Sequence, residues 1–540
     1  MDTILILDFG SQTTQLIGRR IRDSGVYTEI IPGDLALNTA LAEETLNSNV
    51  KGIILSGSPE SVYGEGAAPD KKIYECDLPL LGICYGLHRM TRDLGGKVEP
   101  LPEREYGRIE VKIQGTEDIE QKTENREKIQ KFLKGFKDSF TAWMSHGDTL
   151  TQLAPGFVKI GTSATGYPAV VAHEEKPWFG LQFHPEVTHC EGGNDILKTF
   201  VFDVCGCGKT WSMEHYVEEL KQSLMSRAGG SPVLLLISGG VDSTVAGAAL
   251  LKMLSPEQVH LMYIDTGLMR KGETEAVRTS LEKLGAKNLY IIKAEDEFLS
   301  ALKGREDPEE KRRIIGDLFI TIQEREVTRL GLPKNCFLAQ GTLYTDLIES
   351  GNGIGEKAHI IKSHHNVASP LVDAKRNAGK IIEPLDCLYK DEVRKLGRYF
   401  GIDEEIVRRH PFPGPGLAVR ILGEVTKEKC DILREADAIF IEELKRRRSP
   451  SGASLYDEIW QAFAVLMPIR SVGVAGDMRK YGNVLALRAI TSADGMTADV
   501  YPFETRDLLE ISTRITNSVK EIGRVTYDIS SKPPATIEWE

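Results

Sequence analysis

Residues 234–243 read L-L-L-I-S-G-G-V-D-S, an apolar strand that runs into a Gly-Gly turn and then an alanine-rich helix. Glycine lets the backbone turn sharply and approach an anion, and the amides at the start of the helix point at the same spot. Hydroxyl and carboxylate side chains in the turn add donors and an acceptor for Mg²⁺. The stretch therefore predicts a nucleotide phosphate loop rather than an ordinary serine- and glycine-rich turn. Its members are Ser238, Gly239, Gly240, Val241, Asp242 and Ser243, with Asp242 as the Mg²⁺ ligand.

Composition limits the class of protein. A chain of 540 residues predicts about three to four domains, and a net charge of −12 argues against general nucleic-acid binding. We find no signal peptide and no run of about 18 apolar residues that would cross a membrane. The 8 scattered cysteines are typical of a reducing compartment. We therefore expect a cytoplasmic protein that acts on small molecules, and expect the basic run 445–448 to be a solvated surface.

Short apolar strands alternate with helical patterns through the first 200 or so residues, which predicts parallel sheets flanked by helices. The predicted strands are 4–7, 52–55, 78–83 and 180–183, and a helix is expected over 213–227. A break at 228–232 and a proline-rich turn at 411–416 separate further regions. We predict domains at 1–207, 208–410 and 411–540.

Cys84 lies in the segment Gly82-Ile83-Cys84-Tyr85-Gly86, between an apolar strand and a helix. This is the pattern of a nucleophile elbow with cysteine as the nucleophile. Small flanking residues permit the tight turn, and the helix N-terminus favours the thiolate. A lone cysteine is more commonly a buried packing residue, so the assignment depends on partners elsewhere in the chain.

Two other strand ends supply such partners. Pro185 holds His184 in an extended conformation, so His184 and Glu186 share a face and the carboxylate can orient the imidazole. The turn after strand 52–55 carries Gly57 and Ser58, whose amides, with that of Tyr85, can receive the oxyanion of a tetrahedral intermediate.

Cysteine, histidine and glutamate in this order resemble the class I glutamine amidotransferase family, and residues 234–243 resemble the loop of ATP pyrophosphatases. The first resemblance implies that Cys84 attacks the side-chain amide of glutamine and releases ammonia. This chain departs from the family pattern at Ser58, where glycine is usual, and at His88, where the family has a glutamine that helps to hold the substrate.

Four further segments closely resemble the glutamine-hydrolysing GMP synthetase family: 361–367, 412–420, 470–477 and 531–540. The resemblance covers essentially the whole chain. It implies a multidomain α/β protein with a flavodoxin-like amidotransferase domain, a Rossmann-like ATP pyrophosphatase domain and a small α/β C-terminal domain that binds XMP and forms a homodimer. It implies adenylation of XMP by ATP with Mg²⁺, then replacement of AMP by ammonia to give GMP.

The same resemblance implies roles for individual residues. The expected contacts to XMP are Arg312, Gln461, Asp477, Arg524, Lys532 and Glu538. The candidates for organising adenylation, in and around a lid, are Asp346, Glu349, Lys362, His364 and His365. Asp265, at a strand end, is expected either to position the ATP ribose or to cap its turn.

Three alternatives remain at this point. Another ATP pyrophosphatase amidotransferase, making NAD or asparagine, lacks the C-terminal Lys-Pro-Pro segment. A tRNA-thiolating enzyme shares the phosphate loop but requires an RNA-binding surface, which the acidic balance disfavours. A catalytically silent nucleotide-binding homologue is disfavoured by the intact Cys84, His184, Glu186 and Asp242.

Overall fold

The computed structural model of the chain describes residues 1–35, 49–64, 66–114, 125–333, 335–349, 375–475, 478–492 and 497–540. They form two compact units, the first comprising Met1–Glu219 and the described residues 345–349, and the second comprising Leu220–Tyr344 and residues 375–540. Both units combine sheets with helices, so the predicted multidomain α/β class is confirmed. The domain boundaries at 207/208 and 410/411 stay predictions.

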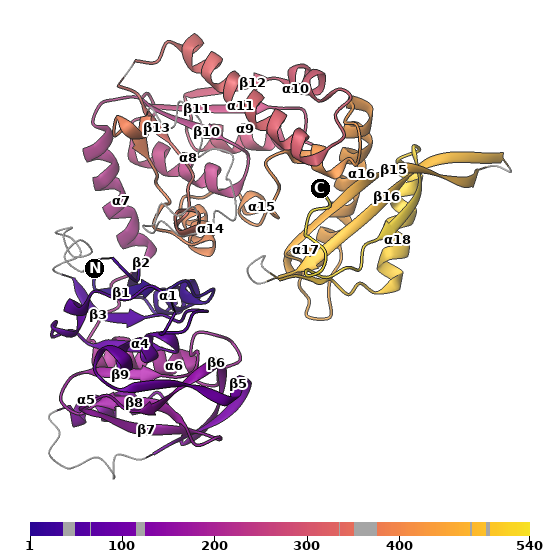
Figure 1. Ribbon diagram of the computed structural model, residues 1–540. Helices are drawn as coiled ribbons and strands as arrows, with labels where there is room; N and C mark the ends of the chain where they lie inside the picture. Colours follow the sequence, from indigo (N-terminus) through magenta and orange to yellow (C-terminus); the bar gives the residue numbers. More distant parts are fainter. Residues whose placement is uncertain are drawn as a thin grey trace. The chain divides into compact units, whose positions relative to one another are not determined.

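A nine-stranded sheet of order β2-β1-β3-β4-β9-β8-β7-β5-β6 forms the centre of the first unit (Figure 1). The strands from β2 to β9 in this order are parallel, and the remaining pairs are antiparallel. The bounds are β1 (Thr3–Asp8), β2 (Tyr27–Pro32), β3 (Val50–Leu55), β4 (Leu80–Ile83), β5 (Lys97–Ile113), β6 (Ser139–Gln152), β7 (Phe157–Ser163), β8 (Pro168–His173) and β9 (Trp178–Leu181). The inner parallel strands β1, β4 and β9 are buried along almost their whole length because both faces of the sheet are covered there, whereas the edge strand β2 alternates.

The helices of the first unit are α1 (Thr14–Asp23), α4 (Tyr85–Asp93), α5 (Arg126–Leu133) and α6 (Gly193–Lys198), with short turns η1 (Lys71–Tyr74) and η3 (Thr199–Val204). The four strands predicted from the sequence are present. The last one begins two residues earlier than expected, at Trp178, because Trp178 pairs in register with Leu80.

The second unit contains a parallel five-stranded sheet of order β12-β11-β10-β13-β14. Its strands are β10 (Val233–Ile237), β11 (Val259–Asp265), β12 (Asn288–Lys293), β13 (Phe337–Ala339) and β14 (Ile381–Ile382). The helices in this part of the chain are α7 (Met213–Ala228), α8 (Val241–Met253), α9 (Glu273–Lys283), α10 (Glu295–Leu302), α11 (Pro308–Leu330), α12 (Tyr344–Glu349), α14 (Lys390–Tyr399) and α15 (Glu404–Val407). The predicted phosphate loop follows the central strand β10, where the carboxyl end of a parallel sheet places ligands.

A four-stranded sheet completes the second unit, with β15 (Gln461–Ala475), β16 (Met478–Thr491), β17 (Asp499–Val500) and β18 (Ile522–Tyr527). The elements beside it are η4 (Gly416–Arg420), α16 (Lys427–Arg446), α17 (Leu455–Glu458) and α18 (Thr505–Ser518). One apolar core joins this sheet to the end of β11 and to α11, since Ile264, Ile315, Leu417, Phe440 and Leu485 belong to the same buried cluster. The two sheets of the second unit are therefore held by a shared core.

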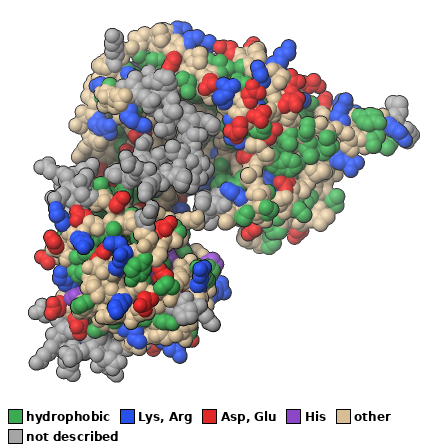
Figure 2. Space-filling view, viewed as in Figure 1, with side chains coloured by type: hydrophobic (Ala, Val, Ile, Leu, Met, Phe, Trp, Pro, Cys, Tyr) green, Lys and Arg blue, Asp and Glu red, His purple; other side chains and the backbone are tan. Residues whose placement is uncertain are grey.

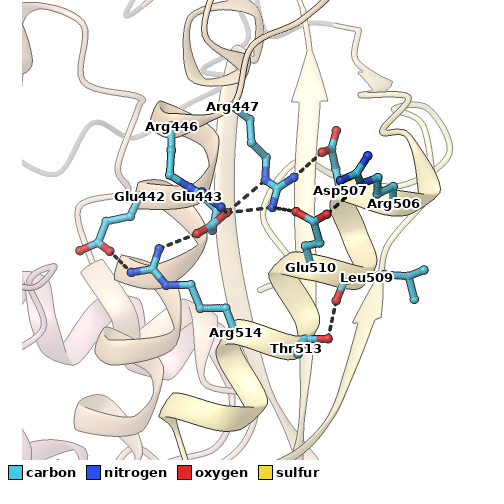
Figure 3. A network of polar contacts seen from close by, with 10 residues as sticks. All are labelled: Glu442, Glu443, Arg446, Arg447, Arg506, Asp507, Leu509, Glu510, Thr513 and Arg514. Carbon is cyan, nitrogen blue, oxygen red and sulfur yellow. Dashed lines mark hydrogen bonds and ion pairs between the residues drawn. The ribbon is translucent and has the colours of Figure 1, made fainter.

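An ion-pair network joins α16 to α18 (Figure 3). Arg447, 11% exposed, pairs with Glu443 on α16 and with Asp507 and Glu510 on α18. Arg514 bonds the other oxygen of Glu443 at 2.6 Å. The expectation that the run 445–448 is only a solvated surface is therefore wrong for Arg447, because the acidic partners come from a helix that is distant in the sequence.

We expect Glu443→Gln to lower the free energy of unfolding at pH 7 by about 2 kcal/mol, as hydrogen bonds to a charged group are lost. Burial would raise the pKa of Glu443, but hydrogen bonds from Arg446, Arg514 and Arg447 lower it from 4.5 to about 2. The folded-state pKa is depressed, so this stabilisation is present above pH 4.5 and is lost as the pH falls towards 2.

Thermal unfolding of wild type and Glu443→Gln between pH 7 and pH 3.5 measures this effect. The difference in stability between the two proteins should become smaller below pH 4.5. Glu435→Gln is the matched control, because Glu435 lies on the same helix and is 49% exposed in its pair with Lys271. Equal losses for the two variants at pH 7 would contradict the prediction.

Candidate functional site

Cys84 lies at the turn between β4 and α4, in a conformation that a side chain rarely adopts. Its φ of 50° is the one positive value among the described residues other than glycine. Such strain costs about 1–3 kcal/mol and persists only where the surroundings enforce it. The neighbours have no room for side chains: a Cβ on Gly86 would lie 2.3 Å from the Leu55 carbonyl oxygen, and one on Gly82 would lie 2.7 Å from the Leu87 nitrogen. The turn is therefore a nucleophile elbow.

His184 and Glu186 follow β9, and their side chains meet beside this elbow. His184 Nδ1 and Glu186 Oε1 are 2.7 Å apart, and Glu186 is fully buried. Burial would lower the pKa of His184, but the Glu186 carboxylate and the Cys84 sulfur, a hydrogen-bond partner of the ring, raise it well above its usual value. The arrangement favours a protonated imidazole beside the Cys84 sulfur, with the carboxylate holding the ring in place.

The turn after β3 holds the predicted oxyanion residues. Ser56 Oγ accepts a hydrogen bond from the Phe9 amide and donates one to the Gly57 carbonyl, which fixes that peptide. A Cβ on Gly57 would lie 3.1 Å from His184 Cε1, so a side chain there would crowd the histidine. The departure at Ser58 introduces no strain, because Ser58 has no positive φ.

A cavity of about 720 Å³ opens beside the elbow and has room for an amino acid. The predicted residues that line it are Ser58, Cys84, Tyr85, His88 and His184. The His88 ring bonds Gln182 at 2.8 Å, and burial lowers its pKa to about 4, so the ring is neutral at pH 7.

The sequence interpretation missed a second histidine in this wall. His146 Nε2 lies 2.9 Å from Glu105 Oε2, and His146 Nδ1 lies 2.8 Å from the Asp148 carbonyl oxygen. A lone histidine beside a glycine on an antiparallel strand carries no distinctive pattern, so no sequence signal pointed to it.

The phosphate loop between β10 and α8 borders a second cavity, of about 440 Å³, which lies entirely in the second unit. The loop residues that line it are Ser238, Gly240, Val241 and Asp242. Lys390 Nζ pairs with both Asp242 oxygens, at 2.7 and 2.5 Å. Among the described residues no cluster of three metal-binding side chains occurs, so a Mg²⁺ here would take Asp242 together with phosphate oxygens, as this ion commonly does.

Other residues of the predicted ATP site support the loop from within. Ser243 Oγ accepts the Ser238 amide at 3.1 Å and donates to the Gly240 carbonyl at 3.1 Å, so its hydroxyl is used inside the loop. Asp265 accepts bonds from the Gly267 amide and the Thr274 hydroxyl, which makes it a cap of its turn. Neither residue lines the cavity.

The second cavity also contains one residue expected to contact XMP. Arg312 lines this cavity, as do residues 410–415. Glu538 and Gln461 are bonded to each other at 2.8 Å, and Gln461 also bonds the Pro411 carbonyl at the edge of this cavity.

Among the described residues, Arg524 and Lys532, two further expected XMP contacts, are not part of this cavity lining. Arg524 bonds Ser471 on β15, and the Lys532 backbone pairs with Ala498. Asp477, Lys362, His364 and His365 lie outside the described residues, and so does the side chain of Glu349. Asp346 lies on α12. Of the candidates for the XMP contacts and the lid, the structure thus places Arg312 on the cavity wall and Gln461 at its edge.

Several residues of this cavity escaped the sequence analysis. Lys390, Arg394 and Arg409 supply positive charge along its lining, and Glu273 lies beside Arg409. Isolated basic residues on surface-type helices resemble solvated charges, so only their position in space identifies them.

The two sites define the class of protein. An elbow cysteine with a histidine and a buried glutamate is the centre of a triad amidotransferase, and the family model for class I glutamine amidotransferases matches residues 5–204. A second model, for the GMP synthase C-terminal domain, matches residues 450–539. The first unit is thus an amidotransferase, joined to a nucleotide-binding unit.

Full-length relatives define the family more closely. GMP synthases (glutamine-hydrolyzing) of Bacillus licheniformis, Bacillus subtilis and Geobacillus kaustophilus are each 48% identical to this chain, and the match covers 100% of this chain and 99% of each relative. The chain belongs to the family of glutamine-hydrolysing GMP synthases. In the described part of the chain, no helix is both long and apolar enough to cross a membrane.

We expect Glu186→Gln to slow alkylation of Cys84 by iodoacetamide at pH 7 by about tenfold, the effect of one pKa unit in the partner. Loss of the carboxylate destabilises the His184 imidazolium, and with it the thiolate. Mass spectrometry of the Cys84 peptide measures the rate. Glu191→Gln is the control, because Glu191 is 54% exposed on the segment that follows. An unchanged alkylation rate in Glu186→Gln would show that Glu186 does not stabilise the protonated form of His184.

Proposed function

We propose that this protein is a ligase that converts XMP to GMP, with glutamine as nitrogen donor and ATP as activator, and forms glutamate, AMP and pyrophosphate. The observation that carries the proposal is the second cavity, where the phosphate loop faces Arg312 and residues 410–415 across about 440 Å³. A nucleotide triphosphate and a purine acceptor would meet there. The family relation of the whole chain supports the same reaction.

In the first unit, the Cys84 thiolate would attack the amide carbon of the glutamine side chain. The amides of Gly57, Ser58 and Tyr85 are the proposed donors to the oxyanion. His184 would give its proton to the departing ammonia, which leaves a glutamyl thioester, and would then take a proton from the water that hydrolyses it. Glu186 keeps the ring oriented, and His88 would contact the substrate as a neutral donor or acceptor.

In the second unit, the xanthine C2 oxygen of XMP would attack the α-phosphorus of ATP, which releases pyrophosphate. Ammonia then adds at C2, and AMP leaves with the oxygen. Ser238, the Gly240 amide and Lys390 would hold the phosphates, and Mg²⁺ bound with Asp242 would neutralise their charge.

Further contacts complete the proposed site. Arg312, Gln461, Asp477, Arg524, Lys532 and Glu538 are proposed to bind XMP, with the basic members near its phosphate. Asp346, Glu349, Lys362, His364 and His365 are proposed to organise adenylation.

We also propose a cytoplasmic homodimer. The described cysteines are all free, which fits a reducing compartment.

The hairpin of β15 and β16 exposes Ile469, Val472, Val474 and Tyr481, and Val474 is 80% exposed. Figure 2 shows hydrophobic side chains on this hairpin with lysine and arginine beside them. Apolar side chains gathered in this way are typical of a protein–protein contact.

The reaction is tested by measuring AMP and GMP formation from ATP, Mg²⁺ and XMP, with either glutamine or ammonium. Wild type should use both donors. Cys84→Ala should lose the glutamine-dependent rate by at least about a thousandfold and keep the ammonium-dependent rate within about twofold, because the second unit is untouched. Absence of GMP with both donors in wild type would refute the acceptor assignment.

The dimer is tested by sedimentation of wild type and Val474→Lys. We expect Val474→Lys to shift the protein towards the monomer, because a charge would be buried in an apolar contact. Met225→Lys is the control, since Met225 is 54% exposed on α7 and outside the hairpin. A monomeric wild type, or a dimer that survives Val474→Lys, would contradict this placement.

A further inference from the structure

Arg409 lies between the phosphate loop and the segment that forms the opposite wall of the second cavity. Its Nη1 donates to the Gly239 carbonyl oxygen and to Glu273 Oε1, both at 2.8 Å. The side chains of Arg409 and Glu273 are 14% and 4% exposed. Arg409 directly precedes residues 410–415, which line the same cavity. One guanidinium therefore joins the loop to the wall.

The bond to Gly239 controls the direction of an amide. In a planar trans peptide the carbonyl and the following N–H point in opposite directions, so a carbonyl held towards Arg409 turns the Gly240 amide away from it. Gly239 has φ +83°, and glycine can rotate into other conformations at little cost. The bond from Arg409 therefore favours one orientation of this peptide.

The rest of the loop is fixed from a different direction. The Gly240 carbonyl accepts bonds from the Ser243 and Thr244 hydroxyls, at 3.1 and 2.9 Å. These bonds anchor the start of α8. In the preceding peptide, between Gly239 and Gly240, the carbonyl is held by Arg409, and the Gly240 amide makes only a long bond of 3.4 Å to Ser238 Oγ.

Glu273 keeps Arg409 in place. Its Oε1 accepts from Arg409, and its Oε2 accepts from the Arg270 amide at 3.0 Å. The carboxylate is buried at the first turn of α9, so its position is rigid. It also neutralises Arg409, which leaves that residue a weaker anion-binding cation than an unpaired arginine.

We propose that Arg409 and Glu273 are a positioning pair, which holds the Gly239–Gly240 peptide with the Gly240 amide available to the ATP phosphates. The pair acts through the loop and not as a direct phosphate ligand. The proposal rests on the proposed function, because the loop must bind ATP. It makes the loop sensitive to the position of residues 410–415 on the XMP side of the cavity.

The two roles open to Arg409 predict opposite effects of Glu273→Gln. If Arg409 were a direct phosphate ligand, removing the neutralising carboxylate would strengthen ATP binding and lower the KM for ATP. If the pair positions the loop, Glu273→Gln weakens the hold on Arg409 and raises that KM.

The test measures pyrophosphate release by the full chain with ATP, Mg²⁺, XMP and ammonium, so that the amidotransferase does not contribute. We expect the KM for ATP to rise about tenfold in Arg409→Gln and about threefold or more in Glu273→Gln. In the variant that carries both substitutions, the two effects on this KM should not add. The KM for XMP should change by less than about twofold. Arg408→Gln is the matched control, because Arg408 is 51% exposed and pairs with Glu404 and Asp457 away from this cavity.

The outcomes are distinct. An unchanged KM for ATP in Arg409→Gln, a lowered one in Glu273→Gln, or equal rises in the KM values for ATP and XMP would each overturn the positioning role. If Arg409→Gln does not fold, as judged by its glutaminase rate and thermal unfolding, the direction in which Glu273→Gln changes the KM for ATP still decides between the two roles of Arg409. No pyrophosphate release by wild type would instead refute the proposed function.

Discussion

Three fully buried cations hold the segment 536–540 across the second unit. Lys311 places its three donors on Glu540 and on the carbonyls of Ala418 and Ile421. Arg420 forms a two-bond pair with Glu538, and Arg488 bonds the carbonyls of Thr536 and Ile537. A buried charge left without its partner costs about 3–5 kcal/mol. Release of the segment would leave Lys311 and Arg420 without their carboxylates, whereas Arg488 keeps its ion pair with Asp528. The segment joins α11 of the nucleotide-binding part to the C-terminal sheet.

The two sites solve the same geometric problem in different ways. Each uses the carboxyl end of a parallel strand, a sharp turn and the start of a helix. At the phosphate loop Gly239 adopts a positive φ without strain. At the elbow the nucleophile itself must occupy the strained position, so Cys84 takes a φ of 50° and the adjacent glycines give up the space. Chemistry decides which residue bears the strain.

Local charge, not net charge, describes the ligands of this protein. The chain carries −12 overall, yet Arg312, Lys390, Arg394 and Arg409 all line the second cavity. A cavity with low-dielectric walls concentrates the field of the groups that line it. The negative net charge therefore coexists with a cavity whose lining is suited to anionic ligands. In the amidotransferase unit the charge is likewise internal, between His184 and Glu186.

Local patterns were enough to predict the strands before Cys84, Gly57 and Gly239 and the helix at 213–227, because periodicity and turn chemistry act over a few neighbouring residues. Long-range partners were not predictable in this way. Lys390 pairs with Asp242, 148 positions away in the sequence, and Arg409 bonds the Gly239 carbonyl, 170 positions away. Nothing in the sequence around Lys390 or Arg409 distinguishes these two side chains from ordinary surface charges. Such contacts arise when packing of the shared core brings distant segments together, so the folded chain alone assigns them.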